Sequence, residues 1–277
     1  MIDSQILNRK GARTTAGVPT EVLILLNQGK IETVNLCEWL VVDQGQLVQV
    51  LWSEKKWKAL GLRLLGDKSV LEGKTAPKKI EAIARMISEQ ISDLKKLKEI
   101  VGLLLLHPSD LVRGWGCYVI GAHSALKLKE RFEWIHPFAT DRNMSVREVA
   151  WMALRESVTH DLDGAIKILS RFSTHADPNI RRFASEITRP RGVWARHIPE
   201  LKEQPERALK ILSPLKSDPS RYVQNSVANW LNDASKSKPQ WVRQICQQWR
   251  RESPTPETAY LVKRALRSLD PTDQIGG

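Results

Sequence analysis

The chain has 277 residues, of which 42% are hydrophobic, so it is long enough to bury a substantial core and a disordered chain is excluded. Its formal net charge of +12 favours an anionic partner, either nucleic acid or a membrane surface. No apolar run approaches the roughly 18 residues of a membrane span. We therefore expect a soluble, intracellular protein that binds nucleic acid and has no membrane partner.

The cysteines and histidines give no sign of a disulfide framework or a metal site. The three cysteines, Cys37, Cys117 and Cys246, are odd in number and far apart in the sequence. The six histidines show neither the HExxH pattern nor paired-ligand spacing. We expect no metal and no cofactor, and a protein of the reducing cytoplasm.

The N-terminal part of the chain is predicted to be helical. Residues 21–57 contain two or three expected helices, residues 80–106 contain two more, and the Gly-, Lys- and Ser-containing stretch 66–77 is expected to be a loop between them. The predicted boundaries are an N-terminal helical cap (1–66), a repeat body (78–268) that forms one continuous solenoid domain with the cap, and a frayed tail (269–277).

From about residue 107 onward a short pattern recurs, in which Val or Ile precedes a charged or amide residue and then small and apolar residues at helical spacing. The anchors of the pattern are Val112, Val146, Ile180, Val223 and Val262, at intervals of 34, 34, 43 and 39 residues. Such intervals are typical of helix-pair solenoids. Turn segments with Asp, Ser or Asn precede several anchors and are expected to cap the following helix: HPSD (107–110), TDRN (140–143), ADPN (176–179) and SDPS (217–220). We predict an all-α, HEAT-like repeat α-solenoid of stacked helix pairs with a concave basic face.

Each predicted second helix has a buried face and a polar row. The anchor and the residues three, four and seven positions later are nearly all apolar or small, as a buried face requires. Residues two, six and ten positions after the anchor are polar in the later repeats: Glu148, Glu156, Arg182, Glu186, Asn225, Asn229, Asp233 and Arg264. We expect Glu148, Glu186 and Asp233 to converge on one groove.

Carboxylates in a basic groove need a reason, because each repels the phosphates that such a groove would bind. One interpretation is that they meet positive charge on a ligand or in a transition state. The other is that they pair with Arg182 or Arg264, as on an ordinary solvated helix surface. Spacing alone leaves both open.

The third repeat ends in an arginine-rich segment. Pro190 and Gly192 are expected to stop the helix and to leave Arg189, Arg191 and Trp194 near its C-terminal end. Guanidinium groups beside a tryptophan suit phosphates together with an exposed base or sugar face. The alternative is that Trp194 is an ordinary packing residue.

Two segments carry a family resemblance. RRFASEITRPRGVW (181–194) and LKSDPSRYVQNSVANWLND (215–233) resemble the signature of the AlkC branch of the HEAT-like repeat (AlkC/AlkD) DNA alkylation-repair glycosylases. Members of that branch carry a similar S-E-x-x-R-P-R stretch with a downstream tryptophan, followed by a D-P-S-x-x-V-x-x-S-V-A-N-x-L-N-D block. SVREVAWMAL (145–154) and LNQGKIETVNLCEWLVVD (26–43) are similar to further family segments, although Trp151–Met152 departs from the family pattern.

The resemblance implies that Glu148, Glu186 and Asp233 are active-site acids and that Trp194 forms an aromatic wall. The implied function is a monofunctional glycosylase, a hydrolase that excises cationic alkylated bases of the 3-methyladenine or 7-methylguanine class. Its expected partner is double-stranded DNA with alkylated bases, bound by a monomer. We expect Asp233 to stabilise the positive charge that develops at the anomeric carbon as the glycosidic bond stretches.

The residues expected to contact DNA are Trp194, Arg182, Arg189, Arg191, Asn229 and Arg264. Two other functions remain open: a non-catalytic HEAT-repeat module that binds DNA or an acidic protein, and a DNA-binding relative that lacks glycosylase activity. The enzyme requires a free carboxylate at the sugar, whereas the adaptor needs its carboxylates paired.

Overall fold

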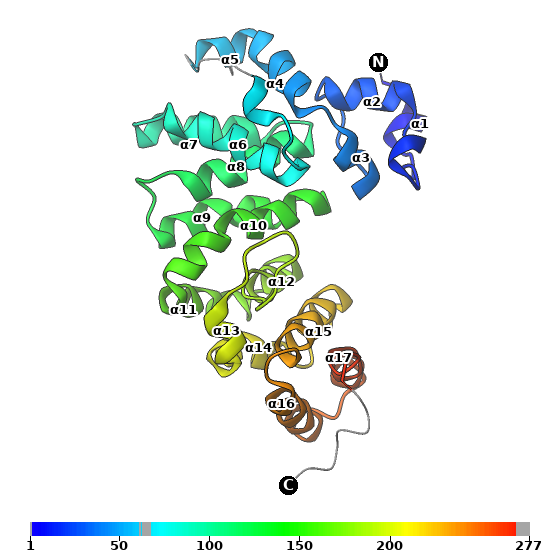
Figure 1. Cartoon of the computed structure of the whole chain (residues 1–277), viewed down its shortest axis with the longest axis vertical. Helices are drawn as coiled ribbons and strands as arrows, with labels where there is room; N and C mark the ends of the chain where they lie inside the picture. The colour runs from blue at the N-terminus through cyan, green and yellow to red at the C-terminus, as the bar shows by residue number, and fades with distance from the viewer. Residues whose placement is uncertain (1, 61, 63–67, 270–277) are drawn as a thin grey trace. The chain divides into compact units, whose positions relative to one another are not determined.

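The computed structural model describes residues 2–60, 62 and 68–269 (Figure 1), and in these residues it contains helices but no strand. The predicted all-α class is therefore confirmed. The α-helices are α1 (Ser4–Leu7), α2 (Thr20–Asn27), α3 (Leu36–Val41), α4 (Gln44–Ser53), α5 (Lys55–Ala59), α6 (Ala76–Glu89), α7 (Leu94–Leu105), α8 (Asp110–Ala122), α9 (Leu128–Ala139), α10 (Met144–His160), α11 (Leu162–Phe172), α12 (Pro178–Ile187), α13 (Pro199–Glu203), α14 (Leu209–Leu212), α15 (Arg221–Ser235), α16 (Pro239–Glu252) and α17 (Pro256–Ala265). Within the described ranges no helix is long and apolar enough to cross a membrane.

The N-terminal region has more helices than the two or three predicted for residues 21–57. The structure has four there, α2 to α5, because polar caps divide the run into short pieces. The side chain of Asn35 accepts a hydrogen bond from the Glu38 N–H at the start of α3, and Asp43 accepts one from the Gln46 N–H at the start of α4. Each cap satisfies a backbone donor that would otherwise have no partner.

The predicted loop at 66–77 is described only from residue 68 onward. Lys68–Leu71 forms a 3-10 turn, and Ala76 and Pro77 already belong to α6, where proline is tolerated in the first helical turn. Residues 66 and 67 lie outside the described residues. The same is true of the predicted frayed tail beyond Leu269.

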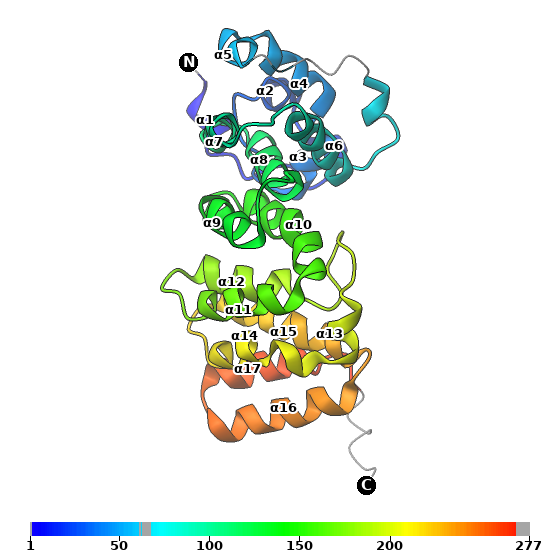
Figure 2. The same cartoon turned by 90° about the vertical axis from the view of Figure 1, so that its left-hand side faces the viewer.

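The chain forms two compact units, Met1–Ala153 and Leu154–Gly277, with the boundary inside α10. In the first unit α8 packs against both α6 and α7 (Figure 1). In the second unit α15 packs between α12 and α17, and the successive helical layers of this unit follow one another in Figure 2. Consecutive second helices of the repeats are therefore neighbours within the second unit, as the solenoid prediction requires.

The repeat anchors lie where the periodicity placed them. All five predicted second helices are present as α8, α10, α12, α15 and α17, and each anchor is fully buried. The residues three, four and seven positions after the first four anchors are buried as well. Burial of this apolar stripe is the main source of stability for a helix pair that cannot fold alone.

The turn aspartates join neighbouring repeats in addition to capping helices. Asp177 caps α12 as predicted, but Ser109 and Ser220 make no side-chain cap bond. Asp218 accepts two hydrogen bonds from Arg181 of the preceding repeat, at 2.6 and 2.9 Å.

The first unit contains the equivalent pair. The Nε of Arg113 donates to Asp141 Oδ2 at 2.8 Å, and the Nη1 of the same guanidinium donates to the carbonyls of His107 and Pro108. In both pairs the arginine directly follows the repeat anchor. One buried arginine thus fixes both its own turn and the next one.

Candidate functional site

Two of the predicted acids lie close together in the second unit. Glu186 is in the last turn of α12 and Asp233 is near the end of α15, and these two helices pack directly against each other. Neither acid lines an open surface, since Glu186 is 3% exposed and Asp233 is 5% exposed. Buried carboxylates require compensation by positive charge or hydrogen bonds.

Arg189 supplies that compensation for both acids. Its Nη1 donates to Glu186 Oε1 at 2.6 Å, and its Nε donates to Asp233 Oδ2 at 2.8 Å. Its Nη2 lies 2.8 Å from the same Asp233 oxygen. Arg189 was predicted to contact DNA, but its side chain is 11% exposed and its guanidinium is directed to the two carboxylates. The reason is helical periodicity, because a residue three positions after Glu186 lies on the same side of the chain.

Both oxygens of Glu186 are occupied. Oε1 accepts from Arg189, and Oε2 accepts from the Ser226 hydroxyl at 2.6 Å and lies 3.5 Å from Arg182. Burial alone would raise the pKa of Glu186, but the Arg182 and Arg189 guanidiniums and the Ser226 hydrogen bond together lower it below its usual value. Glu186 is therefore held as a carboxylate with little capacity left for a ligand.

Asp233 differs from Glu186 in having one oxygen available. Oδ2 takes both contacts from Arg189, whereas Oδ1 lies 3.7 Å from the Lys236 ammonium, which is beyond hydrogen-bond distance. A carboxylate that is fixed through one oxygen keeps the lone pairs of the other for water or for developing positive charge. Of the two buried acids, Asp233 is therefore the one with a carboxylate oxygen left to interact with a ligand.

Arg155, near the end of α10 and within the second unit, holds the segment that follows α12. Its guanidinium donates to the carbonyls of Ile187 and Arg189, and its Nε donates to the Arg196 carbonyl at 3.1 Å. Burial and the nearby Arg189 lower its pKa to about 10, while Glu186 and Asp233 partly offset this change. One buried cation therefore ties the end of α12 to the far side of the loop that carries Trp194.

Trp194 projects from that loop. It is 56% exposed, and among the described residues it is the one non-glycine residue with a positive φ, at 57°. The left-handed conformation is unfavourable for a bulky residue unless the surroundings hold it there. The hydrogen bond from the Ile198 N–H to the Pro190 carbonyl, at 3.1 Å, closes the loop at its base. The exposure of Trp194 favours a ligand-facing residue over the packing residue that the sequence left open.

The other predicted DNA contacts lie on the second unit in less buried positions. Arg182 pairs with Glu186 and stacks on Tyr222, and Arg191 donates to the Ser237 hydroxyl at 3.0 Å. Asn229 accepts a hydrogen bond from Arg267 at 3.0 Å, and Arg264 is partly exposed on α17. Their contact with DNA stays a prediction.

The third predicted acid, Glu148, lies in the first unit. It is half-buried and its Oε2 accepts a hydrogen bond from the Trp151 indole at 2.8 Å. The tryptophan that departs from the family pattern is thus a direct partner of this acid. The convergence of Glu148 with Glu186 and Asp233 stays a prediction.

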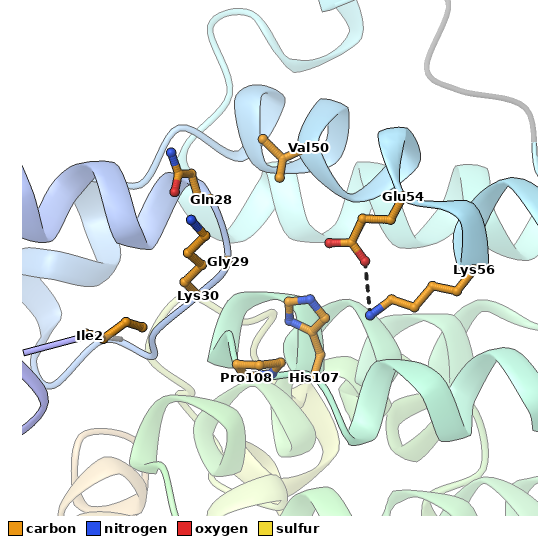
Figure 3. A pocket seen from close by; sticks show the side chains of 9 residues that line it. All are labelled: Ile2, Gln28, Gly29, Lys30, Val50, Glu54, Lys56, His107 and Pro108. Atoms are coloured by element: carbon orange, nitrogen blue, oxygen red, sulfur yellow. Dashed lines mark ion pairs between the residues drawn. The ribbon is translucent and has the colours of Figure 1, made fainter.

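A separate pocket of about 500 Å³ lies in the first unit, where Lys30, Lys56 and His107 are among the residues that line it (Figure 3). Burial, together with the charges of Lys56 and Arg113, lowers the pKa of His107 to about 4, so this imidazole is neutral at pH 7. No group of three metal-ligating side chains is found among the residues that the structure describes.

Sequence reasoning missed Arg155 and gave Arg189 a different role from the one it has in the structure. Arg155 lies outside the polar row, and nothing in a single helix indicates that its partners are the carbonyls of residues 187, 189 and 196. Arg189 was identified, but its spacing of three residues from Glu186 was the available signal for an ion pair rather than for a phosphate contact. Ser226 was assigned to the buried face, and its hydroxyl explains why a polar residue is placed there.

Comparisons with known proteins identify the family of the chain. The model of a family described as DNA alkylation repair enzyme matches residues 73–268. Over 117 residues, which are 42% of this chain and 32% of the relative, the sequence is 41% identical to the uncharacterized protein YhaZ of Bacillus subtilis (strain 168). The chain thus spans about a third of the length of that relative.

Two solved structures are similar to the chain. The Pseudomonas fluorescens alkylpurine DNA glycosylase AlkC, bound to DNA containing an abasic site analog, has a TM-score of 0.61 and 26% identity, covering 73% of this chain and 55% of AlkC. AlkD2 from Streptococcus mutans has a TM-score of 0.60 and 26% identity, covering 73% of this chain and 95% of AlkD2. The solenoid fold inferred from the repeats is the fold of these neighbours.

Proposed function

Because the chain belongs to the DNA alkylation repair enzyme family, we propose that it is a DNA glycosylase that hydrolyses the N-glycosidic bond of cationic alkylated bases in duplex DNA. Lesions of the 3-methyladenine and 7-methylguanine class are its proposed substrates. Alkylation at a purine ring nitrogen makes the base a good leaving group, so the enzyme's main task is to stabilise the sugar. The observation that carries the proposal is the buried Asp233, fixed by Arg189 through one oxygen only.

The proposed mechanism assigns different roles to the two acids. As the bond to the base breaks, positive charge grows at the anomeric carbon, and the Asp233 carboxylate lowers the energy of that state and orients the attacking water. Glu186 keeps Arg189 in place, and Arg189 in turn orients Asp233. Trp194 packs against the deoxyribose or the lesion. Glu148 adds negative charge that attracts the cationic base.

A second function is favoured by one observation. Both buried acids are already paired with Arg189, which is the arrangement that a non-catalytic DNA-binding module would have. The two functions share a basic surface and differ in whether Asp233 takes part in chemistry. Only a measurement of base release separates them.

The test compares Asp233→Asn with wild type on methylated duplex DNA under single-turnover conditions, with released bases measured by mass spectrometry. Asparagine keeps the shape and removes the charge, so we expect base release to fall by about a hundredfold or more. Asp163→Asn is the matched control, because this carboxylate is 85% exposed and belongs to α11. DNA affinity should hold or rise slightly, since a negative charge has been removed.

Two results would contradict the proposal. Unchanged release by Asp233→Asn would move the chemistry to another acid, with Glu148→Gln as the next variant. No release by the wild-type protein from several alkylated substrates would favour the non-catalytic module.

A further inference from the structure

Two arginines of the second unit approach the ring of one tyrosine. The guanidinium carbon of Arg221, the first residue of α15, lies 3.5 Å from the centroid of the Tyr260 ring in α17. The guanidinium carbon of Arg264 lies 5.7 Å from the same centroid. Stacking on an aromatic face holds a guanidinium in one orientation and leaves its N–H edge available.

The two guanidiniums are not paired with a carboxylate among the described residues, since neither Arg221 nor Arg264 has one within ion-pair distance. The Nε of Arg264 is buried and has no hydrogen-bond partner. Two cations held near one ring repel each other, so an anion bound near both guanidiniums would offset that repulsion.

The tyrosine ring is itself fixed. Its hydroxyl donates to Asn225 Oδ1 at 2.9 Å, and Asn225 lies one helical turn after Arg221 on α15. The Tyr260 ring is thus bound to α15 both by its hydrogen bond to Asn225 and by its stacking with Arg221, which restricts the orientation of the guanidinium groups. The three side chains Arg221, Tyr260 and Arg264 thus form a preorganised, positively charged cluster, here called the arginine–tyrosine clamp.

The clamp and the proposed catalytic acid share helix α15. Arg221 begins the helix and is exposed, whereas Asp233 lies near its end, about 120° further round the helix axis, and is buried. With a rise of about 1.5 Å per residue, the backbone positions of Arg221 and Asp233 are about 18 Å apart. Arg267 extends the positive surface between them, since it donates to Asn229 Oδ1.

The preceding repeat contains the same kind of pair. The guanidinium carbon of Arg182 in α12 lies 4.3 Å from the ring centroid of Tyr222 in α15. An arginine of one second helix therefore stacks on a tyrosine of the next second helix twice in succession. Regular spacing along stacked helices matches a ligand with regularly repeated anionic groups, which is the property of a nucleic-acid backbone.

We propose that the arginine–tyrosine clamp binds a backbone phosphate of the DNA strand, a few nucleotides from the base that is processed at Asp233. The guanidinium forks suit phosphate oxygens, which accept hydrogen bonds from two arginines at once. The distance to the lesion rests on the proposed function, whereas the binding of a phosphate requires only that the chain binds DNA. The clamp would set the register of the duplex relative to the catalytic acid.

The experiment scans the duplex with single methylphosphonate linkages, each of which replaces one charged phosphate by a neutral group. For the wild-type protein we expect a linkage on one strand at which the Kd rises about tenfold. In Arg221→Gln/Arg264→Gln the Kd for unmodified duplex should rise by a similar factor. A methylphosphonate at that linkage should then cause no further rise in Kd. The slope of log K against log salt should fall by about one, the value for one lost phosphate contact.

Matched variants separate the clamp from general charge loss. Arg250→Gln removes an exposed arginine from α16 and should leave the methylphosphonate pattern unchanged. Tyr260→Phe keeps the stacked ring but loses the hydrogen bond to Asn225, so it should weaken DNA binding less than Tyr260→Leu, which should approach the double variant. Urea midpoints measured on all variants identify any that fail to fold.

The proposal is overturned if the double variant retains the wild-type Kd, or if it remains sensitive to the same linkage. Base release is followed separately on the same duplexes. A wild-type protein that releases no base but shows the clamp-dependent linkage would refute the glycosylase and support the clamp. If the wild-type protein releases the base but wild type and double variant show the same linkage pattern, the glycosylase is supported and the clamp is refuted.

Discussion

Replacing Arg189 by methionine tests the central feature of the site, one guanidinium that holds two buried carboxylates. Methionine has a similar length, so the main change is the loss of the charge and of the hydrogen bonds to Glu186 and Asp233. Removing one member of a buried ion pair costs about 3–5 kcal/mol, because the remaining charges are left without compensation. Total stabilities of about 5–15 kcal/mol are typical, so this loss would bring the second unit close to unfolding.

The stability that Arg189→Met loses should depend on pH. In the wild type the pKa of Glu186 is lowered, so its contribution is present above the pKa of the unfolded chain and is lost as the pH falls through the folded value. In Arg189→Met the buried Glu186 carboxylate loses one of the guanidiniums that lower its pKa, so it takes up a proton more readily. We therefore expect the stability difference between wild type and variant to be largest near pH 8 and to shrink toward pH 4.

Urea unfolding followed by circular dichroism measures this difference across the pH range. The double variant Arg189→Met/Asp233→Asn is the control, and it should be more stable than Arg189→Met because one uncompensated charge has been removed. A stability loss below about 1 kcal/mol, or one that is the same at pH 8 and pH 4.5, would refute the account of the site as a compensated buried cluster.

Two further predictions concern single buried groups. Arg155→Gln should free the loop that carries Trp194, because glutamine cannot reach the three carbonyls that the guanidinium binds. Trypsin should then cleave after Arg196 about tenfold faster, while the helical circular dichroism signal is retained. An unchanged cleavage rate would contradict the role of Arg155. Burial lowers the pKa of the His107 imidazole to about 4, below its usual value of about 6.5. The protein should therefore lose about 3 kcal/mol of stability as the pH falls from 6.5 to 4, because the unfolded chain takes up the proton first. His107→Gln should show a smaller pH dependence in urea unfolding, and equal dependence in both proteins would argue against a neutral buried imidazole.

The amino-acid sequence alone predicted the helix-pair repeats of this protein. The anchors Val112, Val146, Ile180, Val223 and Val262 are fully buried in the structure, since the spacing of apolar residues fixes which side of each helix faces its neighbours. The sequence prediction was less successful for the N-terminal region, where Asn35 and Asp43 cap the starts of two short helices that periodicity cannot resolve.

The sequence also singled out Glu186 and Asp233, together with Glu148, as unexpected carboxylates on a basic protein. It predicted them as groups lining a groove, because helical spacing places a side chain on a face but does not show how deeply the neighbouring helix covers that face. The packing of α12 against α15 decided the burial of Glu186 and Asp233.

Only the tertiary structure decided which charges compensate which. The sequence offered Arg182 and Arg264 as partners for the acids, whereas the folded chain uses Arg189 for both and Arg182 for Glu186 alone. It also brings Tyr260 of α17 to Arg221 of α15, residues separated by 39 positions. Such pairings depend on the distances between side chains of different helices, and those distances are set by packing rather than by the periodicity of any one helix.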